Sequence, residues 1–187
     1  QMANSIKQTL SYFTLGPEYS YENQGKNLGI TPISDLMGKI VFIADKSNPL
    51  FEQTELDEYI NLASNSMFMR ALRYTDGLLN SQDQSELTDF NKKCMSIILP
   101  DLSSSDDNYA PQLAWTTGCQ MAAMCFQNFD VNMETYSAYF AKSGSAFILK
   151  PAALRYIPVT IPDATQQNPN YSYANRTTST DYYSITI

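Results

Sequence analysis

A nine-residue apolar run at residues 118–126, GCQMAAMCF, constrains the fold more than any other stretch of the chain. It carries no charge, one amide (Gln120), and no alternation of apolar and polar residues. A short run of this kind is typical of a strand that is buried on both faces of a sheet. Alanine and methionine also favour helix, so a buried helical segment is the competing interpretation. The short length and the bounding Gly118 favour the strand.

Three further apolar runs predict short strands: KIVFIA at 39–44, MSIIL at 95–99 and AFIL at 146–149. They are rich in β-branched and aromatic residues, and proline follows the last two, where it would stop a regular ladder. Residues 59–64 and 67–74 fit strand and helix equally well.

Two stretches have helical periodicity. Residues 2–13 place Met2, Ile6 and Leu10 on one face, and residues 81–93 begin with the capping-box spacing of Ser81 and Gln84. Residues 130–142 are mixed in character. Four or five strands separated by helices or long loops predict an α/β fold with parallel strands.

The charge balance excludes some partners. The chain has 12 Lys and Arg against 19 Asp and Glu, and no basic stripe, so nucleic acid and anionic membrane surfaces are poor electrostatic partners. No run approaches the roughly 18 apolar residues of a membrane span. The acidic residues Asp101, Asp106 and Asp107 lack the spacing of a calcium loop, which favours a solvated loop.

Cysteine and histidine usage narrows the chemistry further. Cys94, Cys119 and Cys125 lie in apolar settings without Cys-x-x-Cys spacing, which indicates reduced thiols, an intracellular reducing compartment and no zinc site. The chain has no histidine, so it lacks the commonest general acid–base and cannot by itself form a Ser-His-Asp triad.

Residues 158–187 differ in composition from the rest. This tail has three prolines, several tyrosines and many Thr, Asn and Ser residues, which predicts an extended arm rather than a packed domain. Tyr171, Tyr173, Tyr182 and Tyr183 would suit docking on other structural proteins, because tyrosine buries flat apolar area while its hydroxyl stays hydrated. The sequons at residues 170–172 and 175–177 are short motifs that occur often by chance.

Three segments in this order carry a family resemblance: GKIVFI at 38–43, WTTGCQMAAMCFQ at 115–127 and SGSAFILKPAALR at 143–155. Together they resemble the second half, or Y region, of phosphatidylinositol-specific phospholipase C. The resemblance covers about residues 1–157 and is most similar in kind to the phospholipase-like proteins of large DNA viruses. It implies the C-terminal half of a TIM-type α/β barrel at 1–157, followed by the extended arm at 158–187.

The resemblance also implies where a site would lie. In the family the catalytic histidines and calcium-binding carboxylates lie in the first half of the barrel, which is absent from this sequence. Its phosphate-binding lysines would fall at Ile43 and Asp45, neither of which is basic, and Lys46 is a neighbouring substitute. No catalytic or metal-binding residue is expected in this chain, and calcium is expected only if the N-terminal half is catalytic.

Two more positions of the family's site map onto this chain. A substrate-contacting arginine and aromatic residue fall near Ile97 and Leu99, which are apolar here, and the family's serine falls at Ser64 or Ser66. The candidate substrate-binding residues are therefore Lys46, Ser64 and Ser66. Lys150 and Arg155 match the motif as positions that hold the fold.

These features predict a catalytically silent phospholipase-C-like protein with a structural or assembly role, a minor capsid or virion component of a large DNA virus. The expected partners are the absent N-terminal half of the barrel and other structural proteins that the arm contacts. The alternative is a calcium-dependent phosphatidylinositol phosphodiesterase whose catalytic half lies outside this chain. A lipid-headgroup module is a third interpretation, which would need a basic cluster that the sequence does not show.

Overall fold

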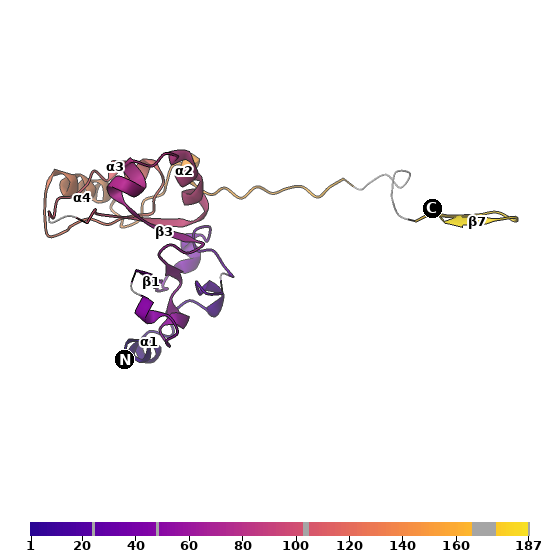
Figure 1. Ribbon diagram of the computed structural model, residues 1–187, viewed down its shortest axis with the longest axis horizontal. Helices are drawn as coiled ribbons and strands as arrows, with labels where there is room; N and C mark the ends of the chain where they lie inside the picture. The colour runs from indigo at the N-terminus through magenta and orange to yellow at the C-terminus, as the bar shows by residue number, and fades with distance from the viewer. Residues whose placement is uncertain (24, 48, 103–104, 166–174, 187) are drawn as a thin grey trace. The chain divides into compact units, whose positions relative to one another are not determined.

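The computed structural model describes residues 1–23, 25–47, 49–102, 105–165 and 175–186 (Figure 1). The chain divides into two compact units, Gln1–Ile157 and Pro158–Ile187. The first unit contains helices and parallel strands, and the second contains an antiparallel hairpin.

The strands described in the first unit form two small parallel sheets. β1 (Ile43–Ala44) pairs with β2 (Leu62–Ala63). β4 (Met95–Leu99) lies between β3 (Met69–Arg73) and β5 (Met121–Ala122), with Ala71 opposite Ile97 and Ile97 opposite Met121. The expected α/β class with parallel strands is confirmed.

The described residues of the first unit form four α-helices: α1 (Met2–Thr9), α2 (Gln84–Lys93), α3 (Gln112–Thr116) and α4 (Val131–Ser143). A π-helix, η5 (Tyr74–Leu79), follows β3. The remaining helical segments are single 3₁₀ turns: η1 (Pro17–Tyr19), η2 (Ile33–Leu36), η3 (Pro49–Phe51), η4 (Asp57–Tyr59) and η6 (Ala152–Leu154).

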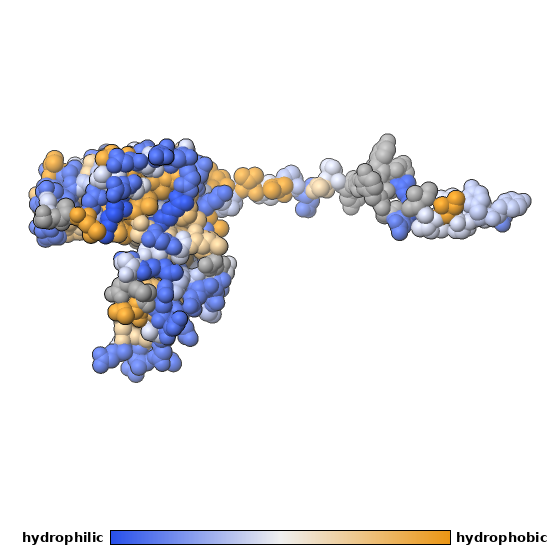
Figure 2. Space-filling model, in the orientation of Figure 1, coloured by the Kyte–Doolittle hydropathy of each residue, from blue (hydrophilic) through white to orange (hydrophobic). Residues whose placement is uncertain are grey.

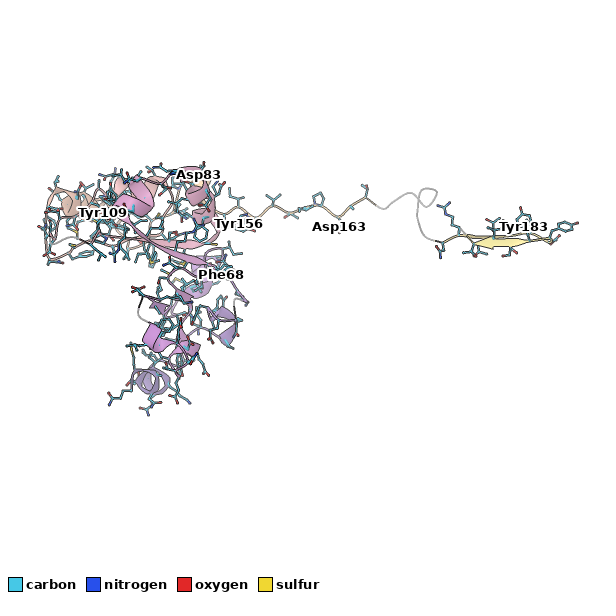
Figure 3. The ribbon with its side chains drawn as sticks, viewed as in Figure 1. Phe68, Asp83, Tyr109, Tyr156, Asp163 and Tyr183 are labelled. Atoms are coloured by element: carbon cyan, nitrogen blue, oxygen red, sulfur yellow. The ribbon has the colours of Figure 1, made fainter. Side chains whose placement is uncertain are left out.

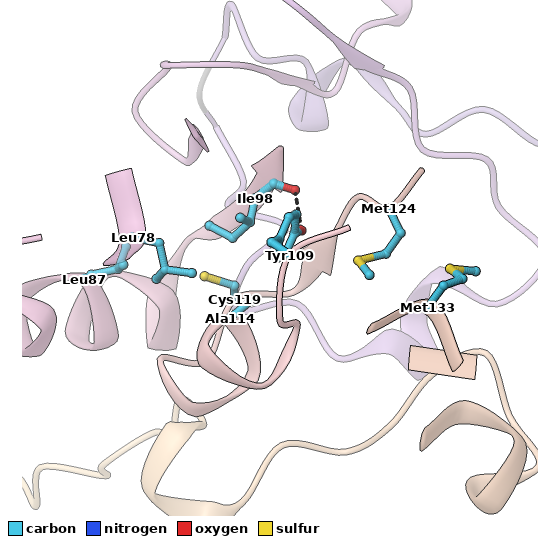
Figure 4. Packing of buried hydrophobic residues seen from close by; sticks show 8 residues of the cluster. All are labelled: Leu78, Leu87, Ile98, Tyr109, Ala114, Cys119, Met124 and Met133. Carbon is cyan, nitrogen blue, oxygen red and sulfur yellow. Dashed lines mark hydrogen bonds between the residues drawn. The ribbon is translucent and has the colours of Figure 1, made fainter. Parts of the chain in front are cut away.

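The two faces of the β3–β4–β5 sheet pack differently, because successive side chains of a strand point to opposite faces. Ile98 belongs to a buried cluster with residues of η5 and the α-helices, and the hydroxyl of Tyr109 in this cluster donates to the Ile98 carbonyl at 3.1 Å (Figure 4). Ile97 belongs to a second cluster around Leu28, Leu62 and Met69. The Ile97 face is half-buried, whereas Ile98 is completely buried.

Three predicted strands are shorter than expected or missing. Only Met121–Ala122 of residues 118–126 and Ile43–Ala44 of residues 39–44 are strand, and neither run is buried on both faces. Residues 146–149 form no strand, and Phe147 and Leu149 are 73% and 76% exposed. A strand needs a neighbour to pair with, and no described strand lies beside residues 146–149. The prediction for 95–99 is confirmed at both ends.

Two helices begin or end at other residues than the sequence predicted. The helix predicted at 2–13 ends at Thr9, and of its predicted apolar face Ile6 is buried while Met2 is 64% exposed. The helix predicted from Ser81 begins at Gln84, because the Asp83 carboxylate accepts the Glu86 N–H at 2.9 Å and acts as the cap (Figure 3). The ambiguous segments 59–64 and 67–74 contain β2 and β3.

The second unit begins with exposed residues 158–165, which have no regular structure. Figure 2 shows hydrophobic side chains in this stretch, and Val159 and Ile161 are 82% and 84% exposed. β6 (Thr177–Ser179) and β7 (Ser184–Thr186) then form an antiparallel hairpin, with Tyr183 next to β7. The tyrosines predicted to dock at 171 and 173, and the sequon at 170–172, lie outside the described residues.

Candidate functional site

Two of the predicted site residues, Lys46 and Ser64, meet where β1 and β2 end. Ser64 follows β2 and is buried, and its hydroxyl donates to Oδ1 of Asp45, which follows β1, at 2.8 Å. The Lys46 N–H donates to Ser64 Oγ at 2.7 Å. The carboxyl ends of parallel strands are where barrel enzymes place their active sites, so this edge is the candidate site.

Asp45 is a fixed negative charge at this edge. Its carboxylate accepts the Ser47 N–H at 2.9 Å and the Ser47 hydroxyl at 2.7 Å, in addition to the Ser64 hydroxyl. Hydrogen bonds from Ser47 and then from Ser64 lower the pKa of Asp45, and the charge of Arg73 lowers it further. The position where the resemblance predicts a phosphate-binding lysine therefore holds an ionised carboxylate.

The side chain of Lys46 and the residue Ser66 make their contacts elsewhere. The Lys46 ammonium lies 3.7 Å from Glu52 and 5.5 Å from the centre of the Tyr21 ring, so its charge is used in other contacts. Ser66 lies in the turn between β2 and β3, where its N–H donates to the carbonyls of Ala63 and Met69. Of the three predicted residues, Ser64 alone places its side chain on Asp45 within the described structure.

A cleft of about 370 Å³ lies at the ends of β3 and β4, lined by Arg73, Thr75, Asp76, Asp101 and Leu102. Nη1 of Arg73 donates to the Pro100 carbonyl at 2.6 Å. The Thr75 hydroxyl and N–H donate to the Asp101 carboxylate at 2.5 and 3.0 Å, and these bonds lower the pKa of Asp101. Arg73 was not predicted from the sequence, where its one signal is a charge at the end of the apolar run MFMRALR.

Ile97 and Leu99 lie on the same face of β4, the strand that ends just before the cleft residue Asp101. Leu99 is the register partner of Arg73, and Ile97 packs in the apolar cluster with Leu62 and Met69. Neither side chain offers a charge or an aromatic ring to a ligand, as the sequence indicated.

The motif residues Gln120 and Lys150 belong to a polar network that joins α2 to the strands. Gln120 Nε2 donates to the carbonyls of Asn91 and Cys94 at 2.9 and 2.8 Å, and its Oε1 accepts the Ser96 N–H at 2.8 Å. Lys150 Nζ donates to the carbonyls of Asn91 and Gly118 at 2.8 and 2.9 Å. These contacts explain why both residues sit in the motif as parts of the framework.

The described residues contain no group of three or more His, Cys, Asp and Glu side chains arranged to hold a metal ion. Cys94, Cys119 and Cys125 are free thiols. None of the helices in the described part of the chain has the length and apolar character needed to cross a membrane.

Comparison with known proteins places this geometry in a family. Residues 46–153, more than half of the chain, match the phosphatidylinositol-specific phospholipase C Y domain. The chain is 39% identical over 79 residues to the human 1-phosphatidylinositol 4,5-bisphosphate phosphodiesterase beta-2, covering 41% of this chain and 7% of that protein. It is 36% identical over 76 residues to a Drosophila melanogaster 1-phosphatidylinositol 4,5-bisphosphate phosphodiesterase, covering 40% of this chain and 7% of that protein.

A solved structure agrees at the level of the fold. The L. pealei PLC21 crystal structure superposes with a TM-score of 0.62 at 21% identity, over 82% of this chain and 25% of that chain. The chain thus spans a small part of the length of each relative. The matched residues 46–153 include Asp45's neighbours Lys46 and Ser64 as well as Arg73, Gln120 and Lys150. The chain belongs to the phosphatidylinositol-specific phospholipase C Y-domain family.

Proposed function

We propose that this chain is the C-terminal half of a phospholipase-C-like barrel and that it does not hydrolyse phosphoinositides. The half-barrel is supported by the half-buried Ile97 face of the β3–β4–β5 sheet and by the exposed apolar side chains of Phe147 and Leu149. A complementary half, from residues outside this sequence or from another chain, would cover this face and pair with the strand edges.

Catalytic silence rests on one observation above all: the ionised Asp45 at the carboxyl end of β1. A carboxylate there repels a phosphate group, because like charges at short range disfavour each other. Asp101 is also ionised, hydrogen bonds and then the charge of Arg73 lower the pKa of both carboxylates, and Ile97 and Leu99 supply no further positive charge to attract a phosphate. In this proposal, the residues of the inherited site hold the loops at the strand ends instead of binding a phosphorylated headgroup.

The test is hydrolysis of phosphatidylinositol 4,5-bisphosphate in vesicles by the full-length protein that contains this chain, with and without Ca²⁺. We expect no turnover in either condition from protein shown to be folded. A fourfold variant, Ile43→Lys, Asp45→Lys, Ile97→Arg and Leu99→Tyr, should sediment with these vesicles more strongly than the natural protein. Calcium-dependent turnover by the natural protein would refute silence.

If the protein is catalytically silent, we propose that its role is structural. In this proposal the protein is a minor capsid component of a large DNA virus. It would assemble into the virion in a reducing intracellular environment. The arm supports this role, because Tyr182 and Tyr183 are 96% and 56% exposed and available to a partner protein. Purified particles should contain the protein, and deletion of residues 158–187 should remove it from them. Particles that lack the natural protein would argue against the role.

The second candidate is a calcium-dependent phosphodiesterase whose catalytic half lies outside this chain. The observation that favours it is the identity of 34–39% to several 1-phosphatidylinositol 4,5-bisphosphate phosphodiesterases. In that case the histidines and calcium ligands would all be upstream. The same turnover assay decides between the two candidates.

A further inference from the structure

The segment at residues 155–163, RYIPVTIPD, carries branched apolar side chains at alternate positions. Ile157, Val159 and Ile161 are all exposed, and none of them lies in a helix or strand. Among the described residues, no backbone–backbone hydrogen bond uses the N–H or the carbonyl of these three. The segment thus has the alternating pattern of a half-buried strand, and in the described chain it has no strand to pair with.

Two prolines keep this segment extended and make its two edges unequal. A residue that precedes proline is restricted to extended conformations, which applies to Ile157 and Ile161. In a strand, successive residues point their N–H groups to opposite edges. Ile157, Val159 and Ile161 therefore share an edge that has all its donors, whereas Pro158 and Pro162 leave the other edge without theirs. The segment can pair fully along one edge only.

Two copies of this segment match each other in an antiparallel pair when Val159 lies on the two-fold axis between them. Ile157 of each copy then lies opposite Ile161 of the other, and the two Val159 residues lie opposite each other. Each of these opposed pairs can exchange both of its N–H···O bonds, while both prolines occupy positions whose bonds would point outward. The branched side chains gather on one face as cross-strand pairs, which stabilise a sheet.

The charges at the ends of the segment fit the same register. Arg155 lies as many positions before Val159 as Asp163 lies after it, so each arginine would oppose the aspartate of the other copy. Neither residue takes part in any ion pair of the described residues, and the buried Nε of Arg155 has no hydrogen-bond partner among them. The net charge of −7 makes two copies repel each other, but the residues between Arg155 and Asp163 are uncharged.

We propose that residues 155–163 bind a second copy of this chain, as an antiparallel pair of strands centred on Val159. The edge with the prolines prevents a third strand from adding, so the assembly closes at two copies. An isolated pair of strands is marginally stable in water, so the dimer is weak, with a Kd on the order of 0.1–1 mM. This pairing does not depend on whether the protein hydrolyses phosphoinositides.

Disulfide cross-linking of the full-length protein that contains this chain tests the register. Opposed residues of a bonded pair have Cα atoms about 5.5 Å apart, within the range of a disulfide, so Val159→Cys should form a covalent dimer under mild oxidation. Thr160→Cys is the matched control, because residue 160 lies opposite Pro158 and its own copy is more than about 7 Å away, too far for a disulfide. The natural protein gives the background from its own cysteines. Equal cross-linking of the two variants, or none above background with Val159→Cys, would overturn the proposal.

Sedimentation equilibrium of two proline variants of the same protein provides a second readout. Val159→Pro removes a donor from the pairing edge of each copy and should weaken dimerisation at least about tenfold. Thr160→Pro removes a donor from the outer edge and should leave the Kd within about twofold. Both positions are exposed and lie outside helices and strands, so both variants should fold as the natural protein does. Equal Kd values for the two variants would assign the association to general apolar contact and refute the strand pair.

Discussion

The ammonium group of Lys150 lies between the backbone carbonyls of Asn91 and Gly118. It thereby joins the last turn of α2 to the segment before β5, and a cation near the carboxyl end of a helix also interacts favourably with the helix dipole. Burial lowers the pKa of Lys150, although the nearby Cys119 opposes the shift. A charged residue in the family motif therefore acts on the framework of the fold.

Replacing Lys150 tests this assignment. Lys150→Met keeps most of the apolar stem and removes the donor, so two partly buried carbonyls lose a partner, and we expect a loss of about 1–3 kcal/mol in the free energy of unfolding. Urea denaturation gives the value. The matched control is Lys142→Met, at an exposed position in the last turn of α4, where the loss should be about 0.5 kcal/mol or less. Equal losses of stability in both variants would contradict the framework role of Lys150.

Asp45 makes stability depend on pH. Its pKa is lowered in the folded chain, so its contribution is present above the unfolded pKa of about 3.9 and is lost as the pH falls through the folded pKa. Asp45→Asn should therefore show a shallower loss of stability below about pH 4 than the natural chain, as followed by urea denaturation at several pH values. Glu55→Gln, at an exposed position, should leave the slope as it is. If the free energy of unfolding fell with pH equally steeply in Asp45→Asn and in the natural chain, Asp45 would not be a source of the pH dependence.

At the scale of elements, α4 shows how local sequence sets both ends of a helix. The Asp130 carboxylate accepts the Met133 N–H at 2.8 Å at the beginning, and Gly144 follows the last turn with φ of 63°. The buried Met133 connects the helix to the cluster that contains Ile98. Caps and one apolar contact thus turn a segment of mixed composition into the longest α-helix of the described chain.

Gly144 gives a test at this scale. A Cβ at this position would meet no atom within 4 Å, so the cost of a substitution comes from the left-handed backbone alone. Gly144→Val should destabilise the chain by about 1–2 kcal/mol, whereas Gly144→Asn, which tolerates this conformation, should cost clearly less. Thermal unfolding followed by circular dichroism compares the two variants. If both variants lost the same amount of stability, the left-handed backbone would not be the cause of the loss.

At the scale of the whole molecule, the first unit exposes apolar side chains, which in the proposed half-barrel would be covered by the complementary half. Phe147 and Leu149 are 73% and 76% exposed, and both lie in a run with the composition of a strand. Exposed apolar patches next to unpaired strand edges promote association with other chains.

We therefore expect the 187-residue chain to self-associate at high concentration. The double variant Phe147→Ser and Leu149→Ser should lower the weight-average mass in sedimentation velocity, with little change in the free energy of unfolding. Unchanged association in the double variant would show that this patch is not the interface.

The sequence by itself determined the parallel α/β class and the elements whose signals are local. β4 could be predicted because its β-branched run is short and ends at Pro100. The framework role of Lys150 was predicted from the family motif in which it lies. The candidate edge was only partly predictable: of the predicted residues Ser64 donates to Asp45, whereas the Lys46 ammonium lies beside Glu52, and Arg73 was not predicted.

The tertiary structure alone decided everything that depends on a neighbour. Residues 146–149 have the composition of a strand but pair with nothing among the described strands, because a ladder needs a second chain segment beside it. The hydrogen bonds from Gln120 to the carbonyls of Asn91 and Cys94 likewise bring together segments that no local pattern connects. Propensity is a property of a few consecutive residues, whereas pairing, burial and charge contacts are set by where the rest of the chain lies.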